Sequence, residues 1–276
     1  MAAASISCCS ILLVSLLFIA ACHSAVGEDN RYTFKEPIGS YCYANPKFNL
    51  SRIANLTQKI DKARDEVVKH ARYSSFVNST IDENTEYPIY ALAQCRGDVS
   101  PSECHTCIEL AAAAIIDLCK YQPDSRVWYD RCFMRFDTED YLQRLDVGCY
   151  VHHTTPQLVP STMTNFSDVR YQFFTQDMGQ EIVKPENRGY AKASKRIDNF
   201  NTIYGICQCT GDLDPDESFL GMTSAVQLFD TYCPRNHGCV IASSSCYVKY
   251  DLYPFFTNHK GRNNGSRKLM SSHDSP

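Results

Sequence analysis

In residues 49–71 the apolar side chains are spaced among polar ones as in an amphipathic helix. The apolar positions recur three or four residues apart, at Ile53, Leu56, Ile60, Ala63 and Val67. Residues at this spacing lie on one face of a helix, and the charged residues between them lie on the other. The pattern therefore predicts a helix with one buried face.

Three further segments complete a structural unit. Residues 87–95 form a short apolar run after a turn signal, and residues 126–136 are rich in aromatic side chains, so both predict strands. Between them, residues 103–119 contain many alanines and favour a helix. This order indicates an α+β unit in which an antiparallel sheet packs against two helices.

The same unit occurs twice in the chain. Three cysteines of the first half have counterparts 114 positions later, because Cys95, Cys119 and Cys132 match Cys209, Cys233 and Cys246. YALAQCRGDVSP at 90–101 also matches YGICQCTGDLDP at 204–215, and CFMRFD matches CYVKYD. A fixed period with aligned cysteines and aromatic residues indicates duplication. We therefore expect two tandem α+β domains, each a disulfide-bonded antiparallel sheet packed against two helices.

The second domain follows this order with a weaker pattern. Residues 166–183 are expected to form its first helix, although their apolar spacing is less regular than that of residues 49–71. Residues 150–164 contain Pro156 and Pro160, so we expect them to be the linker and the entry to this domain.

Four segments divide the chain. They are a signal peptide at 1–27, domains at 28–142 and 143–259, and a disordered polar tail at 260–276. The first 27 residues contain no Lys, Arg, Asp or Glu, and an apolar run from Ile11 to Ala21 precedes small residues. This pattern is typical of a cleaved secretory signal. We therefore expect a secreted, extracellular protein with no membrane span in the mature chain.

Composition and motifs exclude several function classes. The formal net charge is −4 and no long basic run occurs, so we expect no nucleic acid partner. The short motifs of phosphate loops, zinc proteases and serine hydrolases are missing from the sequence, so we expect no enzyme, no cofactor and no metal site. Sequons for N-glycosylation stand at Asn49, Asn55, Asn78, Asn165 and Asn264.

Cys95, Cys104 and Cys107 follow a C-x8-C-x2-C spacing that fits three kinds of site. A C-x2-C pair at a helix start is typical of a thiol oxidoreductase, because the helix N-terminus stabilises a thiolate. A zinc site needs further ligands, and no second pair of this kind occurs nearby. The second domain has Ser218 and Gly221 in place of Cys104 and Cys107, so neither role is required in both copies.

The expected signal peptide favours the third kind of site, a disulfide framework. Three of the 15 cysteines, Cys8, Cys9 and Cys22, precede the expected cleavage point. An even number of cysteines is left, as full pairing requires. The sequence alone leaves many pairings open.

The cysteine pattern of the first domain resembles the ginkbilobin-type family, the stress-antifungal domain of plant cysteine-rich repeat secretory proteins. The resemblance rests on C-x8-C-x2-C, on cysteines 12 and 25 positions after the last of these three, and on the flanking QC, RVWY and CFMRF. It implies three disulfides, Cys42–Cys119, Cys95–Cys104 and Cys107–Cys132. The same domain forms the extracellular half of cysteine-rich receptor-like kinases.

The second domain departs from the family's cysteine pattern. It lacks the second and third motif cysteines, and it has Cys207 and Cys239 where the first domain has Ala93 and Ser125. Our hypothesis for this domain is three pairs, Cys149–Cys233, Cys209–Cys246 and Cys207–Cys239.

Founding members of the family bind mannose through three polar side chains. The resemblance places Tyr43, Arg126 and Asp137 at these positions in the first domain. The arginine is kept, while an aspartate replaces a glutamate and a tyrosine replaces an asparagine. In the second domain Val240 replaces the arginine, so we expect no such site there.

The tripeptide Arg96-Gly97-Asp98 matches an adhesion motif. It lies in the loop that the expected Cys95–Cys104 disulfide closes, and the second domain has Thr210 in place of the arginine. Chance and turn chemistry are sufficient to explain it.

The resemblance implies a secreted, non-catalytic apoplastic protein of plant defence or stress responses, which binds a mannose-containing glycan through the first domain. One alternative is an interaction module that binds a cell-surface receptor ectodomain and has no sugar site. A thiol oxidoreductase that uses Cys104 and Cys107 is the third alternative, and it predicts free reactive thiols.

Overall fold

The computed structural model describes residues 36–43, 55–85 and 87–256. The expected signal peptide at 1–27, the tail at 260–276 and the sequons at Asn49 and Asn264 lie outside these ranges. The described residues belong to one compact unit. Within them, no helix combines the length and the apolar character that crossing a bilayer requires.

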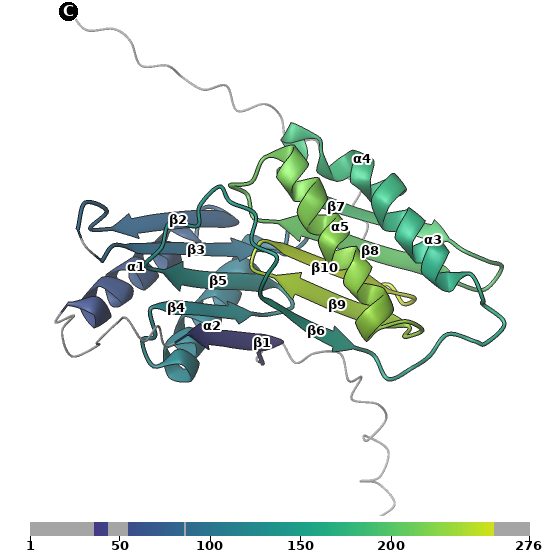
Figure 1. The fold of residues 1–276 in the computed structure, drawn as a ribbon, viewed down its shortest axis with the longest axis horizontal. Coiled ribbons are helices and arrows are strands. Elements are labelled where there is room, and N and C mark those ends of the chain that lie inside the picture. The colour runs from purple at the N-terminus through teal and green to yellow at the C-terminus, as the bar shows by residue number, and fades with distance from the viewer. Residues whose placement is uncertain (1–35, 44–54, 86, 257–276) are drawn as a thin grey trace, which may run out of the picture. The chain divides into compact units, whose positions relative to one another are not determined.

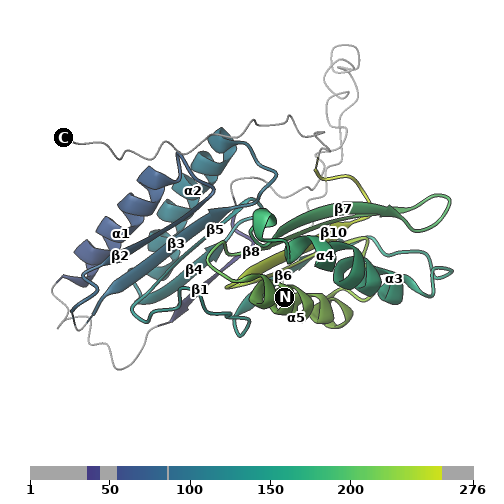
Figure 2. The same cartoon turned by 90° about the horizontal axis from the view of Figure 1, so that it is seen from above.

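The first repeat is a five-stranded antiparallel sheet with two helices on one face (Figures 1 and 2). Its strands are β1 (Gly39–Tyr43), β2 (Phe76–Ile81), β3 (Ile89–Cys95), β4 (Asp124–Trp128) and β5 (Cys132–Asp137). Their order in the sheet is β1-β4-β5-β3-β2. The helices are α1 (Leu56–His70) and α2 (Pro101–Cys119). The face of a sheet that carries no helix is called its open face below.

Both helices of the first repeat bury the side that the sequence predicts. The buried residues of α1 are Leu56, Ile60, Ala63 and Val67. Helix α2 begins after Ser100, whose hydroxyl accepts a hydrogen bond from the backbone N–H of Glu103. The Glu103 carboxylate in turn accepts one from the backbone N–H of Ser100. This capping box fixes where α2 starts.

The second repeat has the same architecture. Its strands are β6 (Tyr150–Thr154), β7 (Tyr190–Arg196), β8 (Thr202–Cys209), β9 (Gly238–Ser243) and β10 (Cys246–Asp251), in the sheet order β6-β9-β10-β8-β7. Its first helical segment consists of α3 (Phe166–Gln172), the π-helix η2 (Phe173–Met178) and α4 (Gly179–Ile182), and a 3-10 turn, η3 (Pro185–Asn187), follows. Helix α5 (Pro215–Tyr232) lies beside this segment on one face of the sheet (Figure 1). The predicted α+β fold class is therefore confirmed.

The expected linker at 150–164 is wrong in its first part, because Tyr150–Thr154 forms strand β6. This strand pairs with β9 at the edge of the second sheet, and none of its residues is buried. An edge strand without buried positions needs no apolar alternation, so the sequence pattern does not reveal it. The segment between the two sheets is instead residues 138–149.

Four of the disulfides expected from the sequence are present in the structure, namely Cys42–Cys119, Cys95–Cys104, Cys107–Cys132 and Cys209–Cys246. Cys42–Cys119 joins β1 to the end of α2 across a sequence separation of 77 residues. On the chain-entropy model a loop of this length stabilises the fold by about 4 kcal/mol.

The expected Cys149–Cys233 disulfide is wrong, because Cys233 pairs with Cys239. The strand register gives the reason. Thr154 on β6 lies opposite Cys239, as Cys42 on β1 lies opposite the matching residue of β4. Cys149 lies before β6 begins, so the second repeat has a threonine, Thr154, at the position of Cys42. The disulfide to Cys233, at the end of α5, is therefore formed from the neighbouring strand β9.

The expected Cys207–Cys239 disulfide is also wrong. Cys207 is on β8 and Cys239 is on β9, and β10 lies between these two strands. Two strand spacings separate them by about 10 Å, which exceeds the Cα separation of about 7 Å that a disulfide can bridge. Cys149 and Cys207 are therefore the unpaired cysteines among the described residues, and Cys207 is buried.

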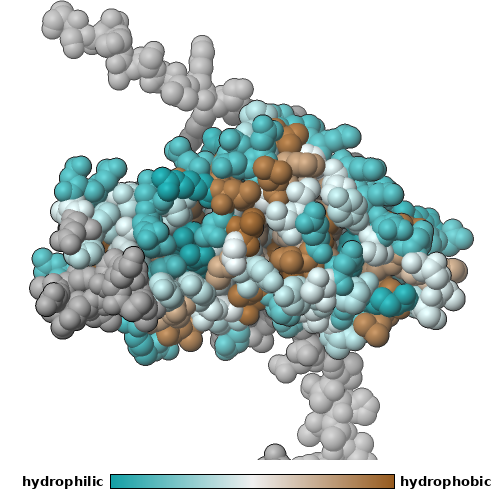
Figure 3. Space-filling view, viewed as in Figure 1, coloured by the Kyte–Doolittle hydropathy of each residue, from teal (hydrophilic) through white to brown (hydrophobic). Residues whose placement is uncertain are grey.

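Hydrophobic patches on the side of the second repeat that carries α3–α5 are interrupted by hydrophilic residues (Figure 3). Exposed apolar side chains on these helices include Tyr171 and Leu220. Isolated apolar side chains are normal on a protein surface, whereas a binding face is usually a larger continuous patch. This side is therefore a weaker candidate for binding than the polar open face of the first sheet.

Candidate functional site

The three positions that the family resemblance singles out lie on the open face of the first sheet. Tyr43 ends the edge strand β1 and is 45% exposed. Arg126 on β4 and Asp137 at the end of β5 are only 6% and 7% exposed. Tyr43 is thus the accessible member of the set, while the two charged residues are covered.

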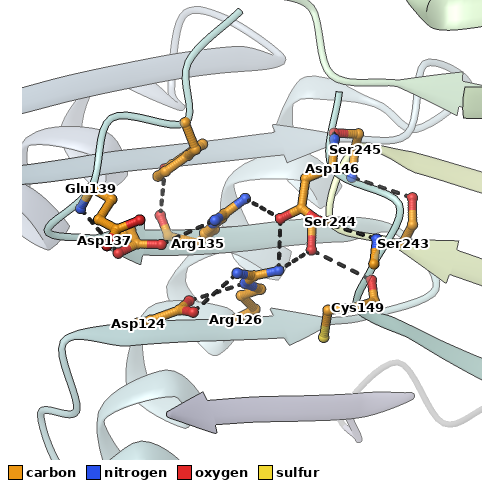
Figure 4. A network of polar contacts seen from close by, with 12 residues as sticks. Asp124, Arg126, Arg135, Asp137, Glu139, Asp146, Cys149, Ser243, Ser244 and Ser245 are labelled. Carbon is orange, nitrogen blue, oxygen red and sulfur yellow. Dashed lines mark hydrogen bonds and ion pairs between the residues drawn. The ribbon is translucent and has the colours of Figure 1, made fainter. Parts of the chain in front are cut away.

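The Arg126 guanidinium is surrounded by partners from three segments (Figure 4). Its Nε and Nη2 donate to the two carboxylate oxygens of Asp124, each at 3.0 Å. Its Nη1 donates to Asp146 Oδ2 at 2.9 Å and to the hydroxyl of Ser244 in the second repeat. Burial alone would lower the pKa of Arg126, but the hydrogen bonds and charges of Asp124 and Asp146 outweigh burial and raise it.

Asp137 has different partners. Its carboxylate accepts hydrogen bonds from Arg135 Nη2 at 3.0 Å and from the backbone N–H of Glu139 at 3.1 Å. Burial raises the pKa of Asp137, and the nearby negative charge of Asp124 raises it further. Arg126 and Asp137 therefore belong to one network, but the structure does not bring them together as a pair.

The network depends on charged residues that sequence reasoning missed, notably Arg135 and Asp146. Arg135 Nη1 donates to the same oxygen of Asp146 as Arg126 does, also at 2.9 Å. A signal for Arg135 was present, because CFMRFD and CYVKYD both place a cation, Arg135 or Lys249, in the middle of a buried strand. Asp146 carries no comparable signal, because its segment contains no motif.

Residues 138–149 run from β5 to β6 across the open face of the first sheet, and we call them the strap. The Tyr141 ring lies 3.8 Å from the Arg135 guanidinium, and its hydroxyl donates to the Arg135 carbonyl at 3.2 Å. The backbone N–H of Gln143 donates to Asp212 of the second repeat at 2.7 Å. The strap thus covers the network and connects both repeats.

An aromatic side chain covers the matching cation of the second repeat. Phe255 is the counterpart of Tyr141, and it lies 4.6 Å from the ammonium of Lys249 and 5.9 Å from the guanidinium of Arg96. In both repeats the chain therefore returns over the open face after its last strand, with an aromatic ring on a buried cation.

A second buried charge cluster centres on Asp130. Its carboxylate accepts hydrogen bonds from Arg96 Nη1 at 2.9 Å, from Lys249 Nζ at 2.7 Å and from the Tyr247 hydroxyl at 2.7 Å. Burial alone would raise the pKa of Asp130, but Lys249 and Arg96 outweigh it and hold the pKa well below its ordinary value. This cluster joins the two repeats, because Lys249 and Tyr247 belong to the second.

The two charged side chains of the Arg96-Gly97-Asp98 tripeptide lie in this region. Arg96 Nε and Asp98 Oδ1 form an ion pair at 2.6 Å, and their side chains are 7% and 8% exposed. A Cβ atom on Gly97 would lie 2.9 Å from the Tyr190 ring. The tripeptide therefore stabilises the contact between the repeats, and its charges are not accessible to an adhesion receptor.

Matching residues of the two repeats contact each other reciprocally. The backbone N–H of Gly211 donates to Gln94 Oε1, and that of Gly97 donates to Gln208 Oε1, both at 3.0 Å. Gln94 and Gln208 occupy the same position in the two copies, as do Gly97 and Gly211. Two copies that meet through the same surface form a pseudo-symmetric interface. The repeated Q-C-x-G-D sequence is thus the signature of this interface.

Trp128 forms an apolar contact beside these polar ones. Its ring packs with Val240 and Ala242 of the second repeat, and its Nε1 donates to the Ser243 carbonyl at 2.8 Å. The open face of the first sheet is therefore covered at this end by the second repeat.

The sequons at Asn55, Asn78 and Asn165 lie on exposed residues. Asn78 is on the edge strand β2, where a glycan would hinder pairing with a further strand. Their occupancy stays a prediction.

The model of the family described as salt stress response/antifungal matches residues 39–139 and 155–253. The chain belongs to this family. The two matched segments correspond to the two repeats, so the C-x8-C-x2-C resemblance is confirmed. The chain is therefore a member of a plant family of cysteine-rich secretory and antifungal proteins related to defence.

Members of this family differ in what accompanies the repeats. Cysteine-rich repeat secretory protein 55 of Arabidopsis thaliana is 33% identical over 77% of this chain and 81% of its own length. An antimicrobial ginkbilobin-2-like protein of Castanea crenata is 28% identical over 59% of this chain and 67% of its own length. Cysteine-rich receptor-like protein kinase 25 of A. thaliana is 25% identical over 68% of this chain but only 28% of its own length.

The fold of this family member also agrees with solved structures. The tandem DUF26 ectodomain of the A. thaliana cysteine-rich receptor-like protein PDLP8 superposes with a TM-score of 0.64 at 19% identity, over 80% of this chain and all of that one. The corresponding ectodomain of PDLP5 gives a TM-score of 0.59 at 19% identity, over 79% of this chain and all of that one. The likeness is one of fold.

Proposed function

We propose that the chain is a secreted, non-catalytic recognition protein of the plant apoplast that acts in defence and binds carbohydrate through the open face of its first repeat. The observation that carries this proposal is Tyr43, an exposed ring on the same open face of the first sheet as the polar network. Tyr43 lies opposite Asp124 in the pairing of β1 with β4. Sugars are bound by aromatic rings that stack on the pyranose and by polar groups that pair with its hydroxyls.

Arg126 is a poor probe of this site, because its donors already serve Asp124, Asp146 and Ser244. A change at Arg126 would disturb the fold together with any binding. Tyr43 is exposed, so its replacement by alanine tests binding with little effect on the fold.

A glycan array tests the proposal with the glycosylated wild-type protein, Tyr43→Ala and a matched control, Tyr73→Ala. Tyr73 is 87% exposed and lies outside the polar network, just after α1. We expect the wild type and Tyr73→Ala to bind the same glycans. Tyr43→Ala should bind them about fivefold more weakly, because an aromatic stacking contact contributes about 1 kcal/mol. Binding of no glycan by the wild type would contradict the proposal.

A second candidate function, binding to a cell-surface receptor ectodomain, is supported by Phe200. This side chain is 96% exposed at the turn between β7 and β8. The turn is stiff, because the Asp198 carboxylate accepts hydrogen bonds from the backbone N–H groups of Phe200 and Asn201, both at 2.7 Å. A pre-organised aromatic residue is well suited to enter a pocket of a protein partner.

The matching turn of the first repeat is held differently. Lys59 on α1 donates to the Thr85 hydroxyl at 3.1 Å and to the Tyr87 carbonyl at 2.9 Å, so this turn is tied to the helix. Receptor binding predicts that Phe200→Asp weakens attachment of the labelled protein to plant protoplasts at least tenfold, and that protease treatment of the protoplasts removes the attachment site. Attachment that resists both changes would exclude this candidate.

A further inference from the structure

Among the described residues of the strap, Asp146 is the only carboxylate that contacts both buried guanidinia of the network. Its Oδ2 accepts hydrogen bonds from Arg126 Nη1 and Arg135 Nη1, both at 2.9 Å. Arg126 and Arg135 are 7% and 6% exposed at their side chains, whereas Asp146 is 27% exposed. The carboxylate therefore approaches two covered cations from the solvent side, as the carboxylate of a bound ligand would.

Each arginine also has a carboxylate partner on its own sheet. Arg126 pairs with Asp124, and Arg135 pairs with Asp137, in both cases at 3.0 Å. Their guanidinia therefore stay oriented when Asp146 is removed. The Nε of Arg135 is buried without a hydrogen-bond partner, so a donor of this site is left unused while Asp146 occupies it.

The charge balance allows one carboxylate to replace another. Two arginines and three aspartates give the network a net charge of −1 with Asp146 and of 0 without it. A ligand carboxylate that enters in place of Asp146 would restore the net charge of −1. A neutral ligand would leave two partly paired cations buried, which is unfavourable.

We propose that Asp146 is an internal occupant of a carboxylate-binding site, and that the external ligand of this site is a uronic acid residue of an acidic glycan. The choice of a sugar acid rests on the proposed function and on Tyr43, which places an exposed ring on the same open face. The glycan carboxylate takes the place of Asp146 on Arg126 and Arg135, and the pyranose ring extends toward Tyr43.

The strap lowers the affinity of the wild type for such a ligand, because it competes for the same donors. A group attached to the chain has an effective concentration in the millimolar range. The Asp146 N–H also donates to the Ser245 hydroxyl of the second repeat at 2.8 Å, which holds the strap in place. Removal of the Asp146 carboxylate should therefore strengthen ligand binding at least tenfold.

Chemical rescue of Asp146→Ala tests the site. Thermal unfolding of wild type and variant is measured with sodium galacturonate, sodium acetate, the uncharged methyl ester of galacturonic acid, and sodium chloride at matched ionic strength. We expect galacturonate at ten times its dissociation constant to raise the Tm of the variant by about 4 °C. The methyl ester and chloride should not raise it, and the wild type should shift by less than half as much.

Asp140→Ala is the matched control, because Asp140 is exposed on the same strap and caps the backbone N–H of Leu142 at 3.1 Å without joining the network. It should respond to galacturonate as the wild type does. Arg135→Gln combined with Asp146→Ala should abolish the rescue. If the alanine variant does not fold, the same rise in Tm with galacturonate is measured on Asp146→Asn.

Three outcomes would overturn the inference. Rescue by neither anion shows that the guanidinia do not form a carboxylate site. Rescue by acetate alone shows that the site does not admit a sugar. Equal rescue by the methyl ester shows that the carboxylate is not recognised.

The glycan array separates this inference from the proposed function. Suppose that the protein binds neutral mannans through Tyr43 but binds no acidic glycan. This result would support the proposed carbohydrate binding and would contradict the inference that the ligand is acidic. Galacturonate rescue of Asp146→Ala, together with no glycan bound by the wild type, would keep the site and contradict the proposed function.

Discussion

Arg126 is held by groups from three parts of the chain, namely its own strand, the strap and the second repeat. Such a guanidinium is buried at a free-energy cost that only its partners offset. The family resemblance identifies this arginine as a ligand-binding residue, but in this structure its donors are bonded to residues of the chain itself. Residue identity at a family position therefore does not establish that the side chain is available.

Replacing Arg126 by alanine should leave Asp124 and Asp146 without a shared partner. We expect the free energy of unfolding to fall by about 3–5 kcal/mol, as for one partner of a buried ion pair. Urea denaturation measures this loss. Arg144→Ala is the control, because Arg144 is exposed on the strap and its loss should change stability by less than about 0.5 kcal/mol. Equal effects of the two variants would show that the network does not support the fold.

The unpaired cysteines make a second prediction at this scale. Alkylation of the secreted protein in denaturant, followed by mass spectrometry, should find two free thiols, at Cys149 and Cys207. In the native state Cys207 should not react, because burial raises the pKa of its thiol and blocks access. Cys207→Ala should fold, since the first repeat has Ala93 at this position. A count of zero thiols would mean that these two residues are paired after all.

Asp130 makes the stability of the protein depend on pH. Its pKa in the folded state lies below the ordinary value of 3.8. The unfolded chain therefore takes up a proton first as pH falls, and the stabilisation that is complete above pH 3.8 is lost below it. We expect Tm to fall steeply between about pH 4 and pH 2. Asp130→Asn should have a lower Tm at pH 7 and a shallower fall, whereas the exposed Asp140→Asn should follow the wild type.

At the level of the elements, the Q-C-x-G-D turns decide how the repeats meet. A Cβ atom on Gly97 would lie 2.9 Å from the Tyr190 ring, and one on Gly211 would lie 3.0 Å from the Phe76 ring. Phe76 and Tyr190 begin the matching strands β2 and β7. Glycine is therefore required twice for the same reason, namely close approach of an aromatic ring to the backbone.

Gly97→Ala and Gly211→Ala should each lower the free energy of unfolding by about 1–3 kcal/mol, as overpacked contacts do. Equilibrium unfolding in urea measures the effect. Gly148→Ala serves as the control, because its new Cβ would meet only Asp146 Oδ1, at 3.8 Å. If Gly97→Ala is as stable as Gly148→Ala, the turn has room that the structure does not show.

The elements that could be predicted from the sequence are those with a buried face. The spacing of Ile60, Ala63 and Val67 identifies α1, and the 114-residue repeat transfers the strands of one copy to the other. Strand β6 could not be predicted, because an edge strand with no buried residue has no apolar pattern. The pairing of Cys233 with Cys239 depends on strand register, which cysteine spacing does not encode.

The same limit applies to the candidate site. Resemblance to a family points to Tyr43, Arg126 and Asp137, and the matching cations in the two copies point to Arg135. Asp146 could not be found in this way, because its contacts join a segment without a motif to strands that precede it in the chain. Contacts of this kind appear only when the fold is known.

At the scale of the whole molecule, the two repeats share buried charge, reciprocal hydrogen bonds and the apolar contact of Trp128. Burying Asp130 requires cations from both repeats, so neither repeat retains a balanced interior without the other. We therefore expect the repeats to fold and unfold as one cooperative unit, in contrast to domains that are joined only by a linker.

Calorimetry should show one unfolding transition with equal calorimetric and van't Hoff enthalpies. Trp128, the single tryptophan of the sequence, reports on the contact between the repeats, so its fluorescence should change together with the far-ultraviolet circular dichroism. Fluorescence that changes before the circular dichroism would show that the repeats separate first and remain folded.

The different disulfides of the two repeats also set how the chain would carry mechanical load. Cys42–Cys119 clamps β1 to the end of α2, so a pull on the amino-terminal side is transmitted through a covalent bond into the helix. None of the described disulfides involves β6, because Cys233 bonds to β9 instead. A pull on the strap would therefore meet only noncovalent contacts at β6, and β6 would separate from β9 while the rest of the second repeat stayed closed. The disulfide thus reinforces β1, whereas β6 is held without one. When single molecules are stretched, the strap and β6 should therefore extend first.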